Sequence, residues 1–331
     1  MTQTDALRSA VVAYCAAIGT DPLLVQGAGG NVSWKDGDTL WIKASGTWLA
    51  QAAEKDIFVP VALAPLRAAT GAGQFGVTPT VLGGSALRPS IETLLHALMP
   101  QRVVVHLHAI EVLAHLVREN WQDEVALLLG DQLSWVAVPY KKPGAELAEA
   151  VNLALQSAPA VQVVFLQNHG VVIGADDVAG VDALLAVLTQ ALRSPVVAGH
   201  GIQPAALPSA SHHPLDDVEL HRLVQDPLLH ARLGTGWALF PDHVVFLGAR
   251  AHTATAESVR GARALPDLIF VEGQGVYATA GVSAAKRLQL RCYFDVLVRQ
   301  RPEHILSTLA AAEIGALLNW DAEQYRMNLS K

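Results

Sequence analysis

Three histidines provide the side chains that a metal-assisted reaction needs. His106 and His108 alternate in the apolar run VVVHLHA, which is typical of a buried strand. Side chains at positions i and i+2 of a strand point to the same face, so both imidazoles can reach one ion. A chance alternation of two histidines is the other interpretation of this pair.

His169 is the third candidate ligand. It follows the apolar run VQVVFLQ in the tripeptide Asn-His-Gly, which predicts a turn at a strand end, where ligands are often held. A third imidazole would give three protein ligands and one open position, the arrangement of catalytic rather than structural zinc. A solvated turn histidine is the alternative for His169 taken alone.

Glu92 is the candidate general base. The sequence predicts a helix over Ile91–Leu98 with Ser90 as its N-cap, so Glu92 falls in the first turn. A carboxylate there is also favoured by the helix dipole, which is the structural alternative. Beside a metal that polarises a carbonyl and stabilises an enediolate, the carboxylate would move the proton. This chemistry makes or breaks a carbon–carbon bond next to a carbonyl.

The glycine-rich segment GAGGNVS, residues 27–33, is a candidate anion-binding loop because glycines let backbone N–H groups converge. It lacks the Lys-Ser/Thr ending of a Walker loop and the spacing of a dinucleotide fingerprint. Ser45, Gly46 and Ser90 could supply further donors. Each of these short segments alone is more often an ordinary turn.

Composition narrows the class of protein. Of the 331 residues, 51% are apolar and 16% charged, which indicates a folded chain and excludes a disordered one. The net charge of -7, without a Lys/Arg run, argues against nucleic acid as a partner. The apolar stretches are too short to span a bilayer, so no membrane partner is expected. The N-terminus has no basic region typical of a signal peptide, and Cys15 and Cys292 are expected to be buried and unpaired; both points predict a cytoplasmic protein.

Periodicity and turn residues predict the order of the elements. Helices are expected over residues 5–18, 91–98, 110–118, 145–156, 178–192, 218–230, 282–299 and 302–318. Strands are expected over residues 40–43, 57–59, 103–108, 135–139, 161–167, 171–173, 243–247 and 268–272. A change to Pro, Ser, Ala and His at 194–216 predicts a boundary near 195–215, between a domain of residues 1–195 and an α+β extension of residues 196–331.

Six segments in order resemble the class II aldolase/adducin N-terminal domain family over residues 5–195. They are GAGGNVS (27–33), KASGTW (43–48), RPSIETLLH (88–96), VVHLHA (104–109), VPYKKPG (138–144) and LQNHGVVIG (166–174). The resemblance implies a three-layer α/β/α sandwich with a mostly antiparallel central sheet. It also implies a cyclic homotetramer with the metal near the subunit interface.

The same resemblance implies a role for each candidate residue. The family's zinc ligands correspond to His106, His108 and His169, and its acid/base glutamate, which can also contact the metal, corresponds to Glu92. The segments that hold the substrate phosphate correspond to Gly30, Asn31, Ser33, Ser45, Gly46 and Ser90.

Two departures from the family pattern bear on the substrate and the second proton donor. Ile91 stands where the phosphate-binding pattern has a second serine, which puts a phosphorylated substrate in doubt. The family's aldolases use a tyrosine after the HxH pair, and no tyrosine lies between Ala109 and Ser134. Residues 196–331 resemble the segment that follows the aldolase domain in long rhamnulose-phosphate aldolase-like proteins, through FPDHVVFLG (240–248) and NWDAEQYR (319–326).

The expected function is therefore a class II aldolase that uses Zn2+ or another divalent metal. It would cleave a hydroxy-ketone or sugar, phosphorylated or not, through a metal-stabilised enediolate. An epimerase or a decarboxylase could use the same site. A non-enzymatic, adducin-like interaction module is the alternative from another class.

Overall fold

The protein is described by a computed structural model that covers residues 3–207, 211–262 and 264–329. The strands are β1 (Asn31–Asp36), β2 (Thr39–Lys43), β3 (Phe58–Ala62), β4 (Val103–Leu107), β5 (Trp135–Val138), β6 (Val163–Leu166), β7 (Gly170–Ala175), β8 (His212–Pro214), β9 (Thr253–Ala254), β10 (Leu268–Val271) and β11 (Gly275–Thr279).

The helices of the first half are α1 (Gln3–Ile18), η1 (Leu49–Gln51), α2 (Leu63–Gly71), α3 (Thr93–Leu98), α4 (Ile110–Leu116), α5 (Trp121–Leu129), α6 (Ala145–Ser157) and α7 (Val178–Ala191). Those of the second half are η2 (Val218–His221), α8 (Arg222–Gln225), α9 (Pro227–Thr235), α10 (Pro241–Leu247), α11 (Ala256–Gly261), α12 (Ala284–Leu297), α13 (Ala311–Leu318) and α14 (Asp321–Leu329).

Within the described ranges, the larger sheet has seven strands in the order β3-β2-β1-β4-β7-β6-β5. Only β5 and β6 pair in parallel among these neighbours; the other pairs are antiparallel. The register places Asn31 of β1 opposite His106 of β4, and His106 opposite Val172 of β7. The centre of the sheet therefore brings together three segments that are far apart in the sequence.

Helices cover both faces of this sheet because its central strands are apolar on both sides. Val103, Val105 and Leu107 of β4 pack in one core with residues of α1 and α7. Val104, between them, packs in another core with residues of α3 and α6. Alternating side chains thus enter opposite cores, as the twofold period of a strand requires. The predicted α/β/α sandwich with a mostly antiparallel sheet is confirmed.

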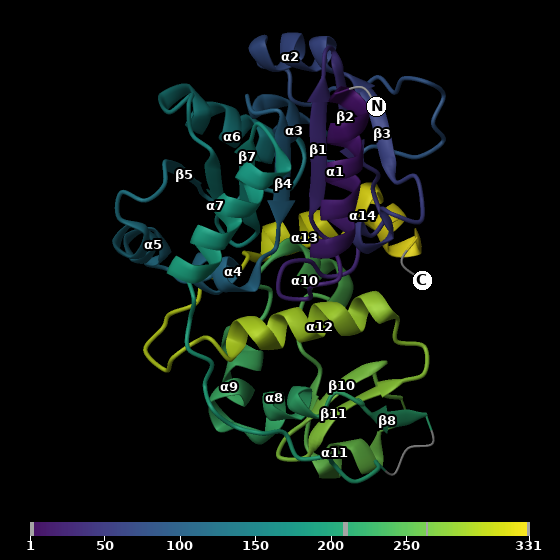
Figure 1. Cartoon of the computed structure of the whole chain (residues 1–331). Helices are drawn as coiled ribbons and strands as arrows, with labels where there is room; N and C mark the ends of the chain where they lie inside the picture. The colour runs from purple at the N-terminus through teal and green to yellow at the C-terminus, as the bar shows by residue number, and fades with distance from the viewer. Residues whose placement is uncertain (1–2, 208–210, 263, 330–331) are drawn as a thin grey trace.

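A smaller sheet, with four strands in the described residues, has the order β8-β11-β10-β9 and lies at the far end of the molecule from β3 (Figure 1). Helix α12 lies between the two sheets and packs against α4. The core of this half includes Ile110, Leu113 and Val117 from α4 and the residue after it. Helices α10, α13 and α14 lie at the end of the larger sheet that faces α12 (Figure 1).

The structure corrects several predicted elements of the second half. Residues 243–247 were expected as a strand and belong to helix α10, which has Pro241 in its first turn. A short buried apolar run has no period that separates strand from helix, and proline fixes the φ angle that a helix start needs. The helix expected over 218–230 is divided at Pro227 into shorter helices. The helix expected over 302–318 begins only at Ala311. The residues before it are not helical because Leu306 pairs with Arg118 in an isolated β-bridge.

The first half has smaller differences, one of which is helix α5 over Trp121–Leu129, where no element was expected. The candidate loop over 27–33 becomes strand β1 at Asn31. Helix α2 lies in a stretch for which no helix was expected. The boundary near 195–215 stays a prediction.

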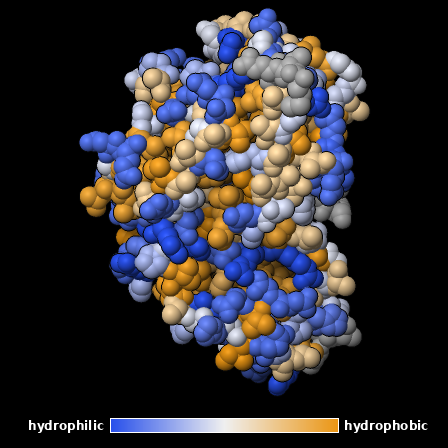
Figure 2. Space-filling model, in the orientation of Figure 1, coloured by the Kyte–Doolittle hydropathy of each residue, from blue (hydrophilic) through white to orange (hydrophobic). Residues whose placement is uncertain are grey.

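The cysteines agree with the sequence-based expectation. Cys15 and Cys292 are both buried and free. In the described ranges, no helix combines the length and the apolar character that crossing a bilayer requires. On the face seen in Figure 2, hydrophilic residues form a band across the molecule where its two halves meet.

Candidate metal centre

The three predicted histidines converge at one end of the central strands. His106 lies in β4, His108 directly follows it, and His169 lies in the turn between β6 and β7. Because β7 pairs with β4, this turn lies beside the end of β4. One nitrogen from each ring lies within 4.8 Å of the others, and all three side chains are buried. This group of ligand atoms could hold one metal ion.

The ring contacts identify the nitrogens that face the centre. His106 Nδ1 lies 3.1 Å from the carbonyl oxygen of Val171, which can only accept, so Nδ1 carries the hydrogen and Nε2 a lone pair. This Nε2 lies 3.2 Å from Nε2 of His108. Two nitrogens bound to one tetrahedral zinc ion, with bonds of about 2.0–2.1 Å, would lie about 3.3 Å apart. The separation of these two atoms therefore fits a shared zinc ion.

Glu92 completes the group on the side of α3. Its Oε2 lies 3.6 Å from His106 Nε2, and its Oε1 lies 3.5 Å from His169 Nε2. Among the described residues, Glu92 Oε1 and His169 Nδ1 are buried without a hydrogen-bond partner. A buried carboxylate oxygen without a donor is costly, and a cation at this point would satisfy it.

The helix start differs from the prediction. Ser90 was expected as the N-cap, but α3 begins at Thr93 and Glu92 occupies the N-cap position without a capping hydrogen bond from its side chain. The Ser90 hydroxyl instead accepts from the backbone N–H of Glu92 over 3.2 Å. The carboxylate of Glu92 is therefore directed to the histidines and not to the helix backbone.

The electrostatic setting favours an ionised Glu92 beside a neutral His169. Burial raises the pKa of Glu92, but His106, His169, the Asn31 amide and His108 outweigh it and lower the pKa to about 2. Burial lowers the pKa of His169 to about 3, against the opposing effect of Glu92. Metal ligands must be deprotonated, and these groups have that form at neutral pH.

A chain of hydrogen bonds holds Glu92 from behind. Asn31 Nδ2 donates to Glu92 Oε2 over 2.8 Å, and Asn31 Oδ1 accepts from His96 Nε2. His96 Nδ1 in turn accepts from the Ser33 hydroxyl over 2.7 Å. Burial lowers the pKa of His96 to about 3, so this ring is neutral and can donate on one side and accept on the other. Ser33, predicted to bind substrate, faces His96, which was not among the predicted site residues.

A pocket opens next to the histidines and contains most of the predicted substrate-binding residues. From the predicted set, its lining includes Gly30, Asn31, Ser45, Gly46, Ser90, Glu92, His108 and His169. Sequence reasoning had not placed Lys43, Asp242 and Glu323, which also line it. Lys43 stands in the KASGTW motif, which was the signal that could have identified it. Asp242 and Glu323 come from the second half, in the segments FPDHVVFLG and NWDAEQYR, whose resemblance implied no role for either residue.

Helix α14 covers part of this pocket. Trp320 lies before it, with the Lys142 ammonium 4.4 Å from the ring centroid, and Tyr325 receives the Arg88 guanidinium at 4.2 Å. A Cβ on Gly46 would lie 2.6 Å from the Leu329 side chain, so the glycine permits this close packing. Cations over aromatic faces contribute about 0.5–1 kcal/mol each at exposed sites. These contacts hold α14 against the loops that form the pocket.

Comparison with known proteins assigns the first half. Residues 9–194 match the family model described as class II aldolase and adducin N-terminal domain. A Bacillus subtilis (strain 168) protein named "Uncharacterized oxidoreductase YuxG" is 27% identical over 171 residues, which are 47% of this chain and 24% of that protein. The chain thus spans about a quarter of the length of this curated relative.

Solved structures are similar over the same part. The N-terminal class II aldolase domain of a conserved Thermoplasma acidophilum protein is 27% identical with a TM-score of 0.49, covering 58% of this chain and 94% of that one. YgbL of Klebsiella pneumoniae, described as a putative aldolase/epimerase/decarboxylase, is 21% identical with a TM-score of 0.44, covering 58% and 89%. An L-fuculose 1-phosphate aldolase is 19% identical with a TM-score of 0.42, covering 58% and 85%.

Proposed function

Because this chain belongs to the class II aldolase and adducin N-terminal domain family, we propose that it is a metal-dependent lyase that cleaves a carbon–carbon bond in a hydroxy-ketone or sugar. The observation that carries the proposal is the convergence of three imidazole nitrogens within 4.8 Å, beside the carboxylate of Glu92. An interaction module has no need for such a group, which is buried and costly to maintain without a ligand.

In the proposed reaction, His106, His108 and His169 hold a divalent ion, and zinc suits three nitrogen ligands with one open position. When bound, the ion would polarise the substrate carbonyl next to the bond that breaks. Glu92 lies close enough to that centre to exchange a proton with the substrate carbon. In the cleavage direction this carbon gains the proton, and in condensation Glu92 removes it.

The pocket is suited to a polyhydroxylated molecule. Asn31, Ser45 and Ser90 provide polar groups, and Lys43 adds a positive charge. Ile91 lines the same pocket at the position where a second hydroxyl was expected. We propose that hydroxyl groups of the substrate contact these residues.

Two isolated, buried cysteines support a cytoplasmic location, and the family resemblance supports a homotetramer.

The first test is elemental analysis of purified protein with Glu92→Gln as the paired variant. About one divalent ion per chain is expected in both proteins, with turnover lost only in the variant. Glu149→Gln, an exposed carboxylate on α6, is the matched control and should keep full activity. If the metal-loaded wild type exchanges no α-proton of any ketose, ketose phosphate or small keto-alcohol, the lyase proposal fails.

Product analysis decides among reactions that share this chemistry. Two carbonyl fragments identify the lyase, one isomer an epimerase, and released CO2 a decarboxylase. Absence of bound metal, together with unchanged stability of His106→Ala, would favour the interaction module.

A further inference from the structure

We propose that Asp242 is a positioning residue that keeps His108 in the tautomer needed for metal binding. Asp242 belongs to α10, outside the residues matched by the family model. The second half of the chain would thus complete a site whose ligands all come from the first half. This inference rests on the metal site of the proposed function.

The geometry places a buried carboxylate behind the ligand. Asp242 is 2% exposed, and its Oδ2 lies 3.5 Å from His108 Nδ1. Gln289 of α12 donates from Nε2 to the same Oδ2 over 3.4 Å. Gln289 Nε2 also lies 3.4 Å from the carbonyl oxygen of Gln26, which it can donate to. The carboxylate is therefore held between α12 and the imidazole, on the side of the ring opposite to His106.

The tautomer of His108 follows from its two neighbours. Nε2 of His106 carries a lone pair, because its Nδ1–H donates to Val171. His108 could donate its own Nε2–H to that lone pair, which would block the metal position. Its Nδ1 lone pair would then face the Asp242 carboxylate, an unfavourable contact between two electron-rich atoms. With the hydrogen on Nδ1, this N–H faces the Asp242 carboxylate and the Nε2 lone pair remains available to an ion.

Two lone pairs separated by 3.2 Å repel each other unless a cation lies between them. Asp242 thus opposes the ring–ring hydrogen bond and favours the arrangement that a metal stabilises. Carboxylate–histidine–metal groups of this kind fix ring orientation and raise ligand basicity, and loss of the outer group typically reduces metal affinity or activity about 10- to 100-fold.

Gly29 provides the space for this contact. A Cβ on Gly29 would lie 2.9 Å from Asp242 Oδ2 and 3.0 Å from His108 Nδ1. Both distances are too short for real Cβ contacts without a shift of the neighbours. An alanine at this position would therefore separate the carboxylate from the ring, although it changes no charge.

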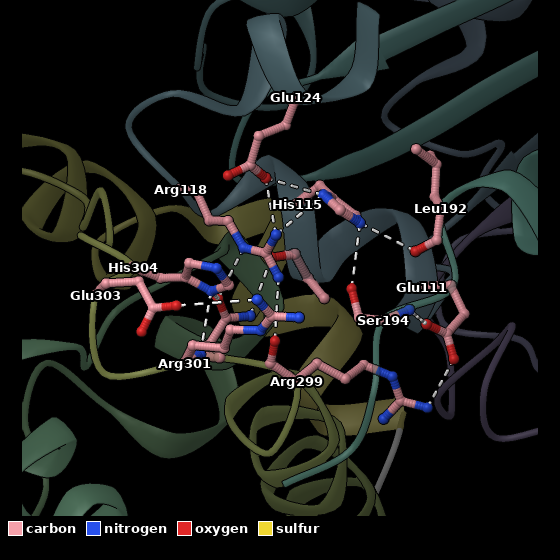
Figure 3. A network of polar contacts seen from close by, with 12 residues as sticks. Glu111, His115, Arg118, Glu124, Leu192, Ser194, Arg299, Arg301, Glu303 and His304 are labelled. Atoms are coloured by element: carbon pink, nitrogen blue, oxygen red, sulfur yellow. Dashed lines mark hydrogen bonds and ion pairs between the residues drawn. The ribbon is translucent and has the colours of Figure 1, made fainter. Parts of the chain in front are cut away.

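A polar network joins the residues that directly follow α12 to the helix that follows His108 (Figure 3). Arg299 Nη2 donates to Glu111 Oε1 of α4 over 2.8 Å, and Arg118 Nε donates to Gln300 Oε1 over 2.9 Å. Helix α4 begins at Ile110, two residues after His108. The network thus ties the end of α12, the helix that carries Gln289, to the helix that follows the ring.

Zinc affinity of the full chain, measured by competition with a chromogenic chelator, tests the proposal. Asp242→Asn should bind zinc about 10- to 100-fold more weakly than the wild type. Asp131→Asn, which removes the same charge from an exposed loop, should bind within about twofold of the wild type. Equal zinc affinity of Asp242→Asn and the wild type would overturn the proposal.

The metal-free protein gives a second readout that a merely structural role would not change. Long-range proton–nitrogen NMR spectra, assigned with His108→Gln, should show the Nδ1–H form of His108 in the wild type. The Nε2–H form should grow in Asp242→Asn and in Gly29→Ala, while His106 keeps its form through Val171. An unchanged His108 tautomer in both variants contradicts the proposal. If the wild type binds no zinc, the proposed function is rejected. The tautomer of His108 in the metal-free protein still tests the role of Asp242.

Discussion

Asn31 donates from Nδ2 to Glu92 Oε2 over 2.8 Å and thereby joins strand β1 to the start of α3. The register between β1 and β4 explains why the amide is there, because Asn31 lies opposite His106. The strand that borders the metal ligands thus also positions the proposed base. His96 and Ser33 continue the chain of hydrogen bonds away from the pocket.

Replacing Asn31 with alanine should therefore impair turnover more than metal binding. Glu92 would lose its hydrogen-bond donor and the orientation that the donor imposes, so kcat is expected to fall about 10- to 100-fold. Zinc content should stay near that of the wild type, because the three histidines are unchanged. Asn152→Ala on the partly exposed side of α6 is the matched control. Unchanged kcat in Asn31→Ala would show that Glu92 needs no such support.

The Glu111–Arg299 pair should contribute strongly to stability. The pair is largely buried, with side chains 15% and 7% exposed, and Glu111 also accepts from the backbone N–H of Ser194. Removing one partner of a buried pair costs about 3–5 kcal/mol, because the other charge loses its compensation. Glu111→Gln and Arg299→Met should each lower the free energy of unfolding by about 3 kcal/mol.

Urea denaturation of the two single variants and the double variant measures the coupling. The double variant should lose clearly less than the sum of the single losses. The exposed pair Arg8–Asp56, with side chains 46% and 70% exposed, is the control and should show a coupling of about 1 kcal/mol or less. Additive losses at Glu111 and Arg299 would mean that the two residues act independently.

Much of the site could be predicted because its signals are local. The alternation of His106 and His108, and the turn at His169, follow from the period of a strand and from its end. Their meeting depends on β4 pairing with β7, although β5 and β6 lie between these strands in the chain, and the period of each strand does not specify that pairing. Ser33 lies on the same face of β1 as Asn31, but farther along the strand. Its residue type alone does not show whether its hydroxyl contacts the substrate or donates to His96.

The contribution of the second half could not be predicted in the same way. Asp242 reaches the site only because α10 is a helix packed on α12, and its apolar run was equally compatible with a strand. The contact also depends on Gly29, far away in the sequence. Such a juxtaposition is set by tertiary packing and leaves no periodic signal.

His243 should make the protein less stable in acid. It is fully buried among Trp237, Phe240 and Tyr293, and in the described structure neither ring nitrogen has a hydrogen-bond partner. Burial lowers its pKa to about 3, whereas the unfolded chain has a histidine pKa of about 6.5. Between these values the unfolded state binds a proton that the folded state does not, so stability falls as the pH falls.

His243→Phe keeps an aromatic ring and removes this proton. The free energy of unfolding of the wild type should fall by about 2 kcal/mol more than that of the variant between pH 7 and pH 5. Urea titrations at several pH values measure the difference. The exposed residue His200 serves as control, and His200→Phe should show the slope of the wild type. Parallel curves for wild type and His243→Phe would mean that His243 accepts a proton while folded.

Glu323 should weaken the binding of anions in the pocket. Its side chain is 1% exposed and lines the pocket together with Lys43, Ser45 and Ser90, the groups best suited to an anion. As an order of magnitude, two like charges about 8 Å apart would repel by roughly 2 kcal/mol at an effective dielectric constant of about 20. Glu323→Gln should therefore bind inorganic phosphate about thirtyfold more tightly than the wild type by calorimetry.

The exposed-site variant Glu149→Gln should not change this affinity. Equal phosphate affinity of Glu323→Gln and wild type would show that Glu323 does not select against phosphorylated substrates.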